Sequence, residues 1–377
     1  EEFSNSGDYN KTITTCHSNF KLKKSGEEIG LFNSNGYVID SIIFDEQITD
    51  ISYGRKPDGN SEWFYFCEPS PLDSNISVGY GDTLRSLPLQ FLPVGGFFTT
   101  HQSIELISDN ASAIIRFTLD GAKPTVNSNI YTSPILMDST TVIRAQVFET
   151  GILPSLITTS TYFIDETSDL PIISIGIDSI YLWGDEIGIY IEGTNGCNLH
   201  GDWGSTPAIF GNYCQDWERP ISMEYYSSEG NLEYKVDAGL KIHGGTTRYY
   251  PQKSLTIHFR NKYSNNEINY QFFHDKPIQV WNSIMLRNGS WLYGDTRTMF
   301  HDGMMQTLIS NEVDIDKQCY KPSVVFINGE YWGIHNIRER TNSHFIETNY
   351  NIDEDNIDML GQKYGNNYVI NGDMEDY

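Results

Sequence analysis

Short runs of β-branched and aromatic residues, separated by glycine turns, recur along this chain and restrict its fold. Asn35-Gly36 and Asn328-Gly329 each lie between two such runs, and Asp120-Gly121 follows a third run at residues 114–118. An Asn-Gly or Asp-Gly pair between β-prone segments is a strong short-range signal for a β-hairpin. The sequence therefore predicts a β-rich protein.

The length of 377 residues exceeds what one ordinary hydrophobic core holds, so we expect two or three domains. Turn-separated strands over residues 1–93 predict a β-sandwich, and residues 94–168 predict a second, smaller all-β unit that ends in a polar linker. From residue 169 to residue 377, a helical pattern at 296–310 joins the strands and predicts an α+β domain. The apolar stripe of that helix consists of Met299, Phe300, Gly303, Met304, Thr307 and Leu308.

The charge of the chain excludes two classes of partner. The formal net charge is −25 and the isoelectric point is about 4.6, so the surface repels nucleic-acid phosphates and anionic lipids. Such acidity is typical of a solvated surface and is compatible with loose binding of divalent cations. There is no apolar run of 18 residues, and we therefore expect no transmembrane helix.

The cysteines and the first residues give weaker information. Cys197 and Cys214 are close enough in sequence to bridge across one loop, but the odd total of five cysteines argues against a complete disulfide framework. The absence of a Cys-x-x-Cys pair gives no support to a structural zinc ribbon. The chain opens with Glu1-Glu2-Phe3-Ser4 and shows no signal peptide, as expected for a mature or trimmed form.

A glycine loop between two predicted strands is the most informative candidate site. Gly244-Gly245 follows one strand, and Lys253 begins the returning strand on the face of Leu255 and Ile257. Glycine loops expose backbone N–H groups to phosphate, and a lysine on a core face needs a partner for its ammonium. That partner is either a nucleotide phosphate or an internal carboxylate. The alternative is a plain glycine turn with a lysine that snorkels at the strand end.

Two segments of the first half resemble known accessory domains. Residues 17–22, 25–27 and 52–55 look like the second half of a lamin-tail domain, an immunoglobulin-like sandwich, so the chain is expected to begin inside that domain. Residues 118–145 are similar to the chitobiase/β-hexosaminidase C-terminal domain, an accessory sandwich without catalytic residues. The resemblance implies spacer modules or weak glycan contacts.

The second half resembles the CotH kinase family, in that family's order and spacing of motifs. The matching segments are residues 215–220, 242–245 with 251–255, 285–288, 297–302, and 328–334 with 338–340. The resemblance implies a partial atypical kinase-like domain over residues 169–377 and MgATP-dependent phosphorylation of protein serine. It also implies a bacterial protein at the cell surface or outside the cell.

The family resemblance also implies roles for individual residues. Lys253 would hold the nucleotide phosphates beside Gly244-Gly245, and Glu339 would pair with Lys253 as in kinases. Arg297 and Asp302 either position the nucleotide or cap and brace their helix.

The resemblance further implies that the family's metal-binding and catalytic aspartates lie beyond Tyr377. We therefore expect no catalytic and no metal-binding residue within this chain, and at most nucleotide affinity. The alternative is a non-catalytic cell-surface scaffold or glycan-binding protein.

Other groups of residues give weaker predictions of metal or sugar binding. Asp353, Asp355 and Asp358 look like the start of a calcium loop but lack its glycine and glutamate, which favours a solvated acidic turn. His243 and His258 lie on paired strands without a third ligand in the sequence. Four tryptophans could contact sugars, although core packing is the simpler role. They are Trp203, Trp217, Trp291 and Trp332.

Overall fold

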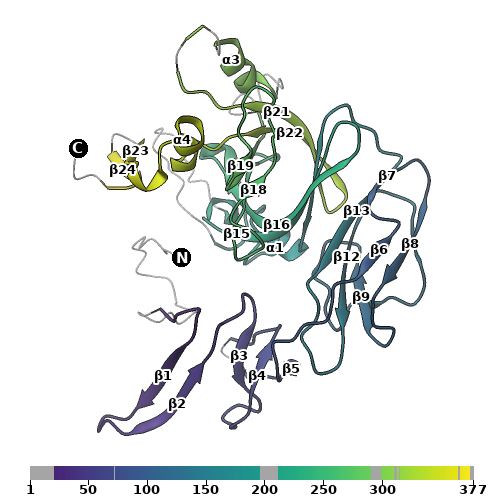
Figure 1. Cartoon of the computed structure of the whole chain (residues 1–377), viewed down its shortest axis with the longest axis vertical. Coiled ribbons are helices and arrows are strands. Elements are labelled where there is room, and N and C mark those ends of the chain that lie inside the picture. Colours follow the sequence, from purple (N-terminus) through teal and green to yellow (C-terminus); the bar gives the residue numbers. More distant parts are fainter. Residues whose placement is uncertain are drawn as a thin grey trace. The chain divides into compact units, whose positions relative to one another are not determined.

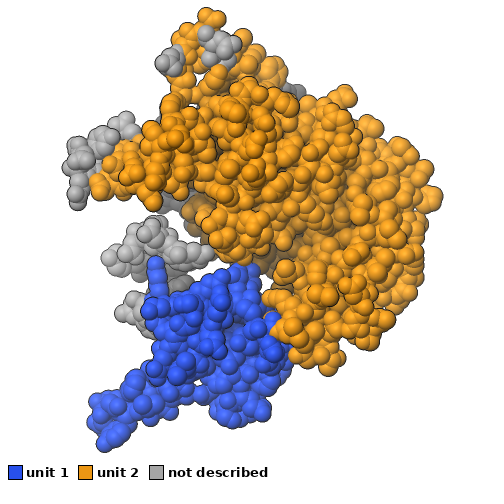
Figure 2. Space-filling model, in the orientation of Figure 1, with its two compact units in different colours: residues 1–83 blue, residues 84–377 orange. Residues whose placement is uncertain are grey.

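The protein is described by a computed structural model that divides into two compact units. Residues 21–71, 73–195, 211–289, 299–309, 312–313, 315–363 and 366–373 are described. The first unit is Glu1–Thr83 and the second is Leu84–Tyr377 (Figure 2). The predicted β-rich, multidomain character is confirmed.

The first unit contains a hairpin and a small sheet. Strands β1 (Glu27–Phe32) and β2 (Val38–Phe44) pair around the predicted Asn-Gly turn. There Gly36 has a φ of 82°, a conformation that favours glycine. The second sheet is formed by β3 (Ser52–Arg55), β4 (Trp63–Phe66) and β5 (Gly79–Tyr80). The lamin-tail resemblance stays a prediction, and part of its motif lies outside the described residues.

The second unit begins with two facing sheets. One contains, in spatial order, β10 (Asn129–Ile130), β9 (Ile114–Thr118), β12 (Thr141–Phe148), β13 (Thr158–Ile164) and β7 (Gly96–Phe98). The other contains β11 (Ile135–Met137), β8 (Gln102–Ile107) and β6 (Gln90–Leu92). Both sheets contribute to one buried cluster, with Ile104 from β8 and Ile143 from β12 fully covered. This agrees with the small all-β unit expected from the sequence.

Seven strands then close into a barrel (Figure 1). Their order is β14 (Ile172–Ile177), β15 (Glu218–Tyr226), β16 (Leu232–His243), β17 (Ser254–His258), β20 (Ser283–Arg287), β22 (Glu330–Arg338) and β21 (Tyr320–Ile327). Closure comes from the parallel pairing of β14 with β21, while the other neighbours are antiparallel. Alternate residues of each strand fill the apolar interior, as expected for a small barrel.

Short elements surround the barrel. They are α1 (Ser179–Trp183), η1 (Asn212–Cys214), η2 (Thr246–Tyr249), β18 (Ile268–Asn269), β19 (Val280–Trp281), α3 (His301–Ile309), α4 (Ser343–Tyr350), η3 (Glu354–Asn356), β23 (Met359–Lys363) and β24 (Asn366–Asn371). The part from residue 169 onward is therefore mostly β with few helices, and the α+β prediction overstated its helix content. None of the described helices has the length and apolarity needed to cross a membrane.

The predicted helix at 296–310 is present over His301–Ile309, but its apolar stripe does not face a core. Phe300, Met304 and Leu308 are all exposed, and Leu308 keeps 63% of its surface accessible. Only Gly303 of the described stripe is buried, because the ring of Tyr320 lies against it. The periodicity correctly predicted a helix, and most of its apolar stripe is exposed in the structure.

The predicted hairpin around Asn328-Gly329 joins β21 and β22 and is confirmed. Asn328 and Gly329 have φ values of 53° and 85°, as a tight hairpin turn needs. The Asn328 side chain also accepts a hydrogen bond from the Ile177 amide and donates one to the Ile177 carbonyl, both at 2.9 Å. The turn thereby fixes the end of β14 next to β21.

An aromatic cluster joins the small sandwich to the barrel inside the second unit. Phe163 of β13 stacks on Phe97 at 4.5 Å and meets Tyr226 and Phe326 of the barrel edge-on. Next to this cluster, the buried Glu224 carboxylate accepts the Thr161 amide hydrogen at 2.9 Å. Apolar packing and a buried polar contact together hold the two parts against each other.

Candidate functional site

The glycine loop lies where β16 ends and η2 begins. Gly244 has a φ of 104°, and a Cβ placed there would come within 2.5 Å of the Thr247 hydroxyl. Gly245 is exposed, and a Cβ added to it would meet nothing within 4 Å. The backbone at Gly245 is therefore open to solvent, while Gly244 is required by the turn itself; contact of this loop with phosphate stays a prediction.

Lys253 lies on the core-facing side predicted from its parity and is 3% exposed. Its ammonium donates to the carbonyls of Arg248 at 2.7 Å and Tyr250 at 2.9 Å. It also lies 4.4 Å from the ring centre of Tyr213 and 5.0 Å from that of Tyr190. Burial lowers the pKa of Lys253 to about 8. Within the protein, its partners are backbone carbonyls and aromatic rings rather than a carboxylate, and the role of Lys253 toward a nucleotide phosphate stays a prediction.

Glu339 is paired with Lys276, which corrects the predicted pairing with Lys253. The Glu339 carboxylate is 2% exposed and accepts from the Lys276 ammonium at 2.8 Å and the Cys319 amide at 2.7 Å. Asn349 of α4 also accepts from Lys276 at 2.7 Å. Glu339 therefore belongs to a buried Lys–Glu pair, but with a different lysine from the one predicted.

Sequence reasoning missed Lys276 because the residue lies outside any regular element. It belongs to the segment between β18 and β19, so no strand or helix periodicity predicts which way its side chain points. A charged residue beside Pro277 in a turn is ordinarily read as solvated. Only the tertiary structure brings Lys276 to Glu339, 63 residues along the chain.

The outward side of β16, β17, β20 and β22 is polar. Lys241, Thr256, Met285 and Arg338 form one row across the four strands, and their chain neighbours in the same strands face the barrel interior. Next to this row, His243 pairs with Ser254 and Arg287 pairs with Asn336. We call this outward side of the four strands the polar face.

Cationic side chains gather on the polar face, although the chain is strongly acidic overall. Burial lowers the pKa of His243 to about 4 and that of His258 to about 3, and the charge of Arg340 is the next largest cause for both. Both imidazoles are therefore neutral at pH 7, and Arg340 lies close to them. The Arg340 side chain makes no hydrogen bond or ion pair with any residue that the structure describes. Its charge is thus available to an anion.

Asp302 braces the same face. Its carboxylate bonds the fully buried Arg338 guanidinium at 2.5 Å and lies 3.3 Å from Arg287. Of the two roles left open for Asp302, the structure shows the bracing one, since α3 is tied to β20 and β22 through this carboxylate. Arg297 lies outside the described residues.

A shallow hollow of about 210 Å³ opens beside the Lys276–Glu339 pair. Glu339, Arg340, His344 and Phe345 are among its lining residues. Arg340 therefore belongs both to the hollow and to the surroundings of the polar face. That volume includes open solvent, and the enclosed space is far smaller than the roughly 300–1,000 Å³ of usual small-molecule sites, so the hollow is a surface depression and does not by itself define a binding site.

The remaining sequence predictions fall into two groups. Trp217 lies under the Arg219 guanidinium at 4.7 Å, and the Trp332 indole donates to the Tyr190 hydroxyl at 2.9 Å. These two tryptophans pack against the protein, which fits the core-packing interpretation. Trp203, Trp291 and Cys197 lie outside the described residues.

The acidic turn at 353–358 has a local structural role. The Asp353 carboxylate caps η3 by accepting the Asp355 amide hydrogen at 3.1 Å, and Asp358 accepts that of Asp373 at 3.0 Å. These contacts agree with the acidic turn predicted from the sequence, and Glu354 lies inside it.

Comparison with known families agrees with this architecture. Residues 93–160, which include strands of both facing sheets, match the chitobiase/β-hexosaminidase C-terminal domain. Residues 240–375, which include the glycine loop, Lys253, Lys276 and Glu339, match the CotH kinase protein family. No match to a curated protein was found. The chain thus carries a chitobiase/β-hexosaminidase C-terminal domain followed by a CotH kinase domain.

Proposed function

We propose that the CotH kinase domain of this chain binds MgATP and that the full-length protein containing it transfers the terminal phosphoryl group of ATP to serine of a protein substrate. The observation that carries the proposal is the family match over residues 240–375. Phosphoryl transfer by a protein depends mainly on holding and neutralising the phosphates. The cationic residues near the glycine loop support this function.

The residues present fit a polyphosphate. The Arg340 side chain has no hydrogen bond or ion pair among the described residues, although the charge of Asp216 acts on it, and Arg287 lies on the neighbouring barrel surface. Guanidinium groups bind phosphate oxygens in a bidentate manner, and the open backbone at Gly245 can approach an anion closely. We assign the phosphates of the nucleotide to this region, with Arg340 as the principal contact.

Lys253 and the Lys276–Glu339 pair have supporting roles in this proposal. Lys253 ties the carbonyls of Arg248 and Tyr250 together and so fixes the segment that follows the glycines. Lys276 and Glu339 form one wall next to Arg340. Mg²⁺ would arrive with ATP and reduce the negative charge of its phosphates. Asp302 is the described carboxylate nearest to Arg287, at 3.3 Å, and we assign it a bracing role rather than a metal-binding one.

We also propose that the protein acts at the cell surface or outside the cell.

A different class of function, a non-catalytic scaffold or glycan-binding protein, is favoured by one observation. The chitobiase-type domain is packed onto the barrel through the cluster of Phe97, Phe163, Tyr226 and Phe326. A rigid joint of this kind suits a spacer that presents its neighbour at a fixed orientation.

The decisive experiment incubates the full-length protein that contains this chain with Mg²⁺ and ATP labelled on the terminal phosphate, with a serine-rich acceptor protein. We expect label on serine, detected by mass spectrometry, and a large loss in Arg340→Gln. The exposed Lys123→Gln variant removes the same charge from the chitobiase-type domain and serves as the control. Unlabelled serine together with retention on immobilised polysaccharide would favour the scaffold instead.

A further inference from the structure

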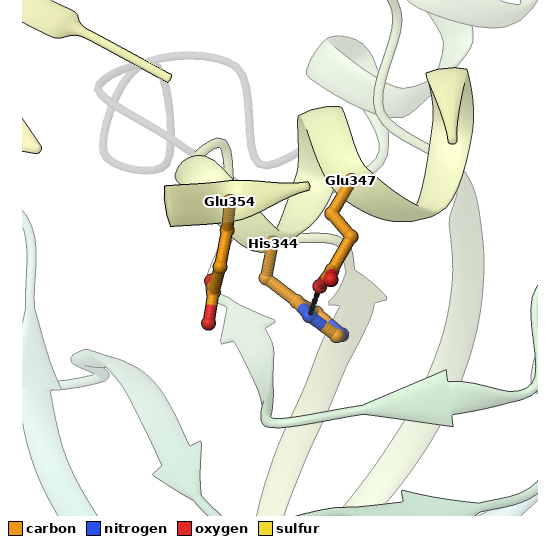
Figure 3. A group of neighbouring side chains, drawn as sticks. All are labelled: His344, Glu347 and Glu354. Carbon is orange, nitrogen blue, oxygen red and sulfur yellow. Dashed lines mark hydrogen bonds and ion pairs between the residues drawn. The ribbon is translucent and has the colours of Figure 1, made fainter. Parts of the chain in front are cut away.

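Three side chains with metal-ligating atoms converge at the start of α4. His344 and Glu347 lie on one face of the helix, and Glu354 comes from η3 (Figure 3). One imidazole nitrogen and one carboxylate oxygen from each glutamate lie within 4.8 Å of one another. His344 also lines the hollow beside Arg340, but none of the three residues is assigned a contact with the phosphates.

The local fold explains why the three meet. Asn342 caps α4 by accepting the Phe345 amide hydrogen at 3.1 Å, which places His344 in the first turn. The spacing of three residues then puts Glu347 on the same side of the helix. The helix ends at Asn351 in the left-handed conformation, and the chain turns back so that the Glu354 carboxylate accepts from the Ser343 hydroxyl at 3.1 Å.

The hydrogen bonds of His344 leave one nitrogen facing negative charge. Its Nε2 lies 3.2 Å from the carbonyl oxygen of Val280, which can only accept, so Nε2 carries the hydrogen. Its Nδ1 lies 3.0 Å from Oε2 of Glu347, which also only accepts when ionised. A neutral imidazole has a single hydrogen. In that tautomer Nδ1 keeps its lone pair beside the Glu347 carboxylate, which is the arrangement in which a histidine nitrogen and a carboxylate oxygen can bind one cation.

We propose that His344, Glu347 and Glu354 bind a first-row divalent cation of the Zn²⁺ type. One imidazole nitrogen and two carboxylate oxygens form a three-ligand set that leaves a fourth position open to water. Ligands about 2.1 Å from a tetrahedral ion are about 3.4 Å apart. Separations within 4.8 Å therefore close by at most about 1.4 Å, and the 3.0 Å contact between His344 and Glu347 widens slightly. Glu347, whose side chain is 40% exposed, is free to make that movement.

The surroundings of the three residues match those of known metal ligands. A metal-binding histidine typically donates its other N–H to a backbone carbonyl, and its carboxylate neighbours are themselves hydrogen-bonded. Val280 supplies that carbonyl, and Ser343 supplies the hydroxyl that holds Glu354. Mg²⁺ and Ca²⁺ prefer all-oxygen sites, so the imidazole favours Zn²⁺ over both.

Binding at this position would also stiffen the support of the Lys276–Glu339 pair. Phe345 and Asn349 of the same helix contact Lys276, at 4.9 Å from the Phe345 ring centre and at 2.7 Å from the Asn349 amide oxygen. The metal site does not depend on the proposed kinase activity, because its ligands do not include any residue assigned to the phosphates.

The test is calorimetric titration of ZnCl₂ into the full chain after treatment with a chelator, repeated with MgCl₂. We expect a saturable Zn²⁺ site that excess Mg²⁺ does not displace and that disappears in Glu347→Gln and Glu354→Gln. Both variants keep the shape of the side chain and the His344–Val280 contact, so loss of fold does not explain the result. Asp355→Asn removes a neighbouring exposed charge outside the cluster and should leave the site intact.

A second readout uses Co²⁺ in place of Zn²⁺. Tetrahedral Co²⁺ with nitrogen and oxygen ligands has visible absorption bands, which His344→Ala should abolish. The proposal is overturned if Zn²⁺ does not bind, or if the two glutamine variants bind it as the wild type does. In the first case the contact between Nδ1 and Glu347 is that of a doubly protonated ring.

Discussion

Lys253 gives the stability of the protein a specific dependence on pH. Its ammonium is almost fully covered, and burial lowers the pKa from 10.5 in the unfolded chain to about 8. Between these two values the unfolded state binds more protons than the folded state, so the free energy of unfolding rises with pH. The destabilising effect of the buried charge is fully present below pH 8 and disappears above pH 10.5.

The size of the effect follows from the two pKa values. Linkage predicts that Lys253 alone raises the free energy of unfolding by about 1.3 kcal/mol between pH 7 and pH 9. Lys253→Met removes the titrating group while keeping most of the side-chain volume. We would measure urea unfolding of wild type and variant at both pH values and compare their difference, which cancels the other titrating groups.

The difference between wild type and Lys253→Met should therefore change by about 1.3 kcal/mol over this range. Lys123→Met, at an exposed position, should show no such change. An equal difference at pH 7 and pH 9 would refute the reasoning, because it would mean that the ammonium of Lys253 is as well solvated in the folded protein as in the unfolded one.

Three further predictions concern stability. Lys276→Met leaves the buried Glu339 carboxylate without its cation and should cost about 3–5 kcal/mol in urea unfolding. Adding Glu339→Leu to Lys276→Met should restore part of that loss. If the free-energy costs of the two single substitutions simply add in the double variant, the two side chains do not interact. Gly244→Ala forces a φ of 104° on alanine and should cost about 1–2 kcal/mol, whereas Gly245→Ala should cost much less in the same assay. Glu224→Gln weakens a buried contact between the small sandwich and the barrel and should lower the melting temperature measured by calorimetry. An unchanged melting temperature would contradict the role given to that carboxylate.

Local features of the fold could be predicted from the sequence because they depend on neighbouring residues. The Asn328-Gly329 hairpin follows from the left-handed conformation that both residues tolerate. The core-facing parity of Lys253 follows from strict alternation along a strand. The small two-sheet unit could be predicted from the strand patterns of the sequence and from its resemblance to the chitobiase-type domain.

Closure of the barrel could not be predicted in the same way. It depends on the parallel pairing of β14 with β21, about 150 residues later, for which the sequence has no local signal. Among the described residues of the α3 stripe only Gly303 is buried, because periodicity indicates a helix but not what packs against it.

The site itself was predicted only in part. Glu339 was expected to pair with a lysine, and it does, but the partner is Lys276 from an irregular segment. Glu354 lies inside an acidic turn that was read as solvated, and its approach to His344 depends on the reversal of the chain at Asn351. Alternation and spacing indicate which face a side chain occupies, whereas its partner is set by the tertiary fold.

The most direct test of the proposed nucleotide site is calorimetric titration of the protein with MgATP. We predict saturable binding that weakens at least tenfold in Arg340→Gln, equal to about 1.4 kcal/mol, and is unchanged in Lys123→Gln. Equal affinity in the two variants, or no binding to the wild type, would contradict the assignment of the phosphates to Arg340.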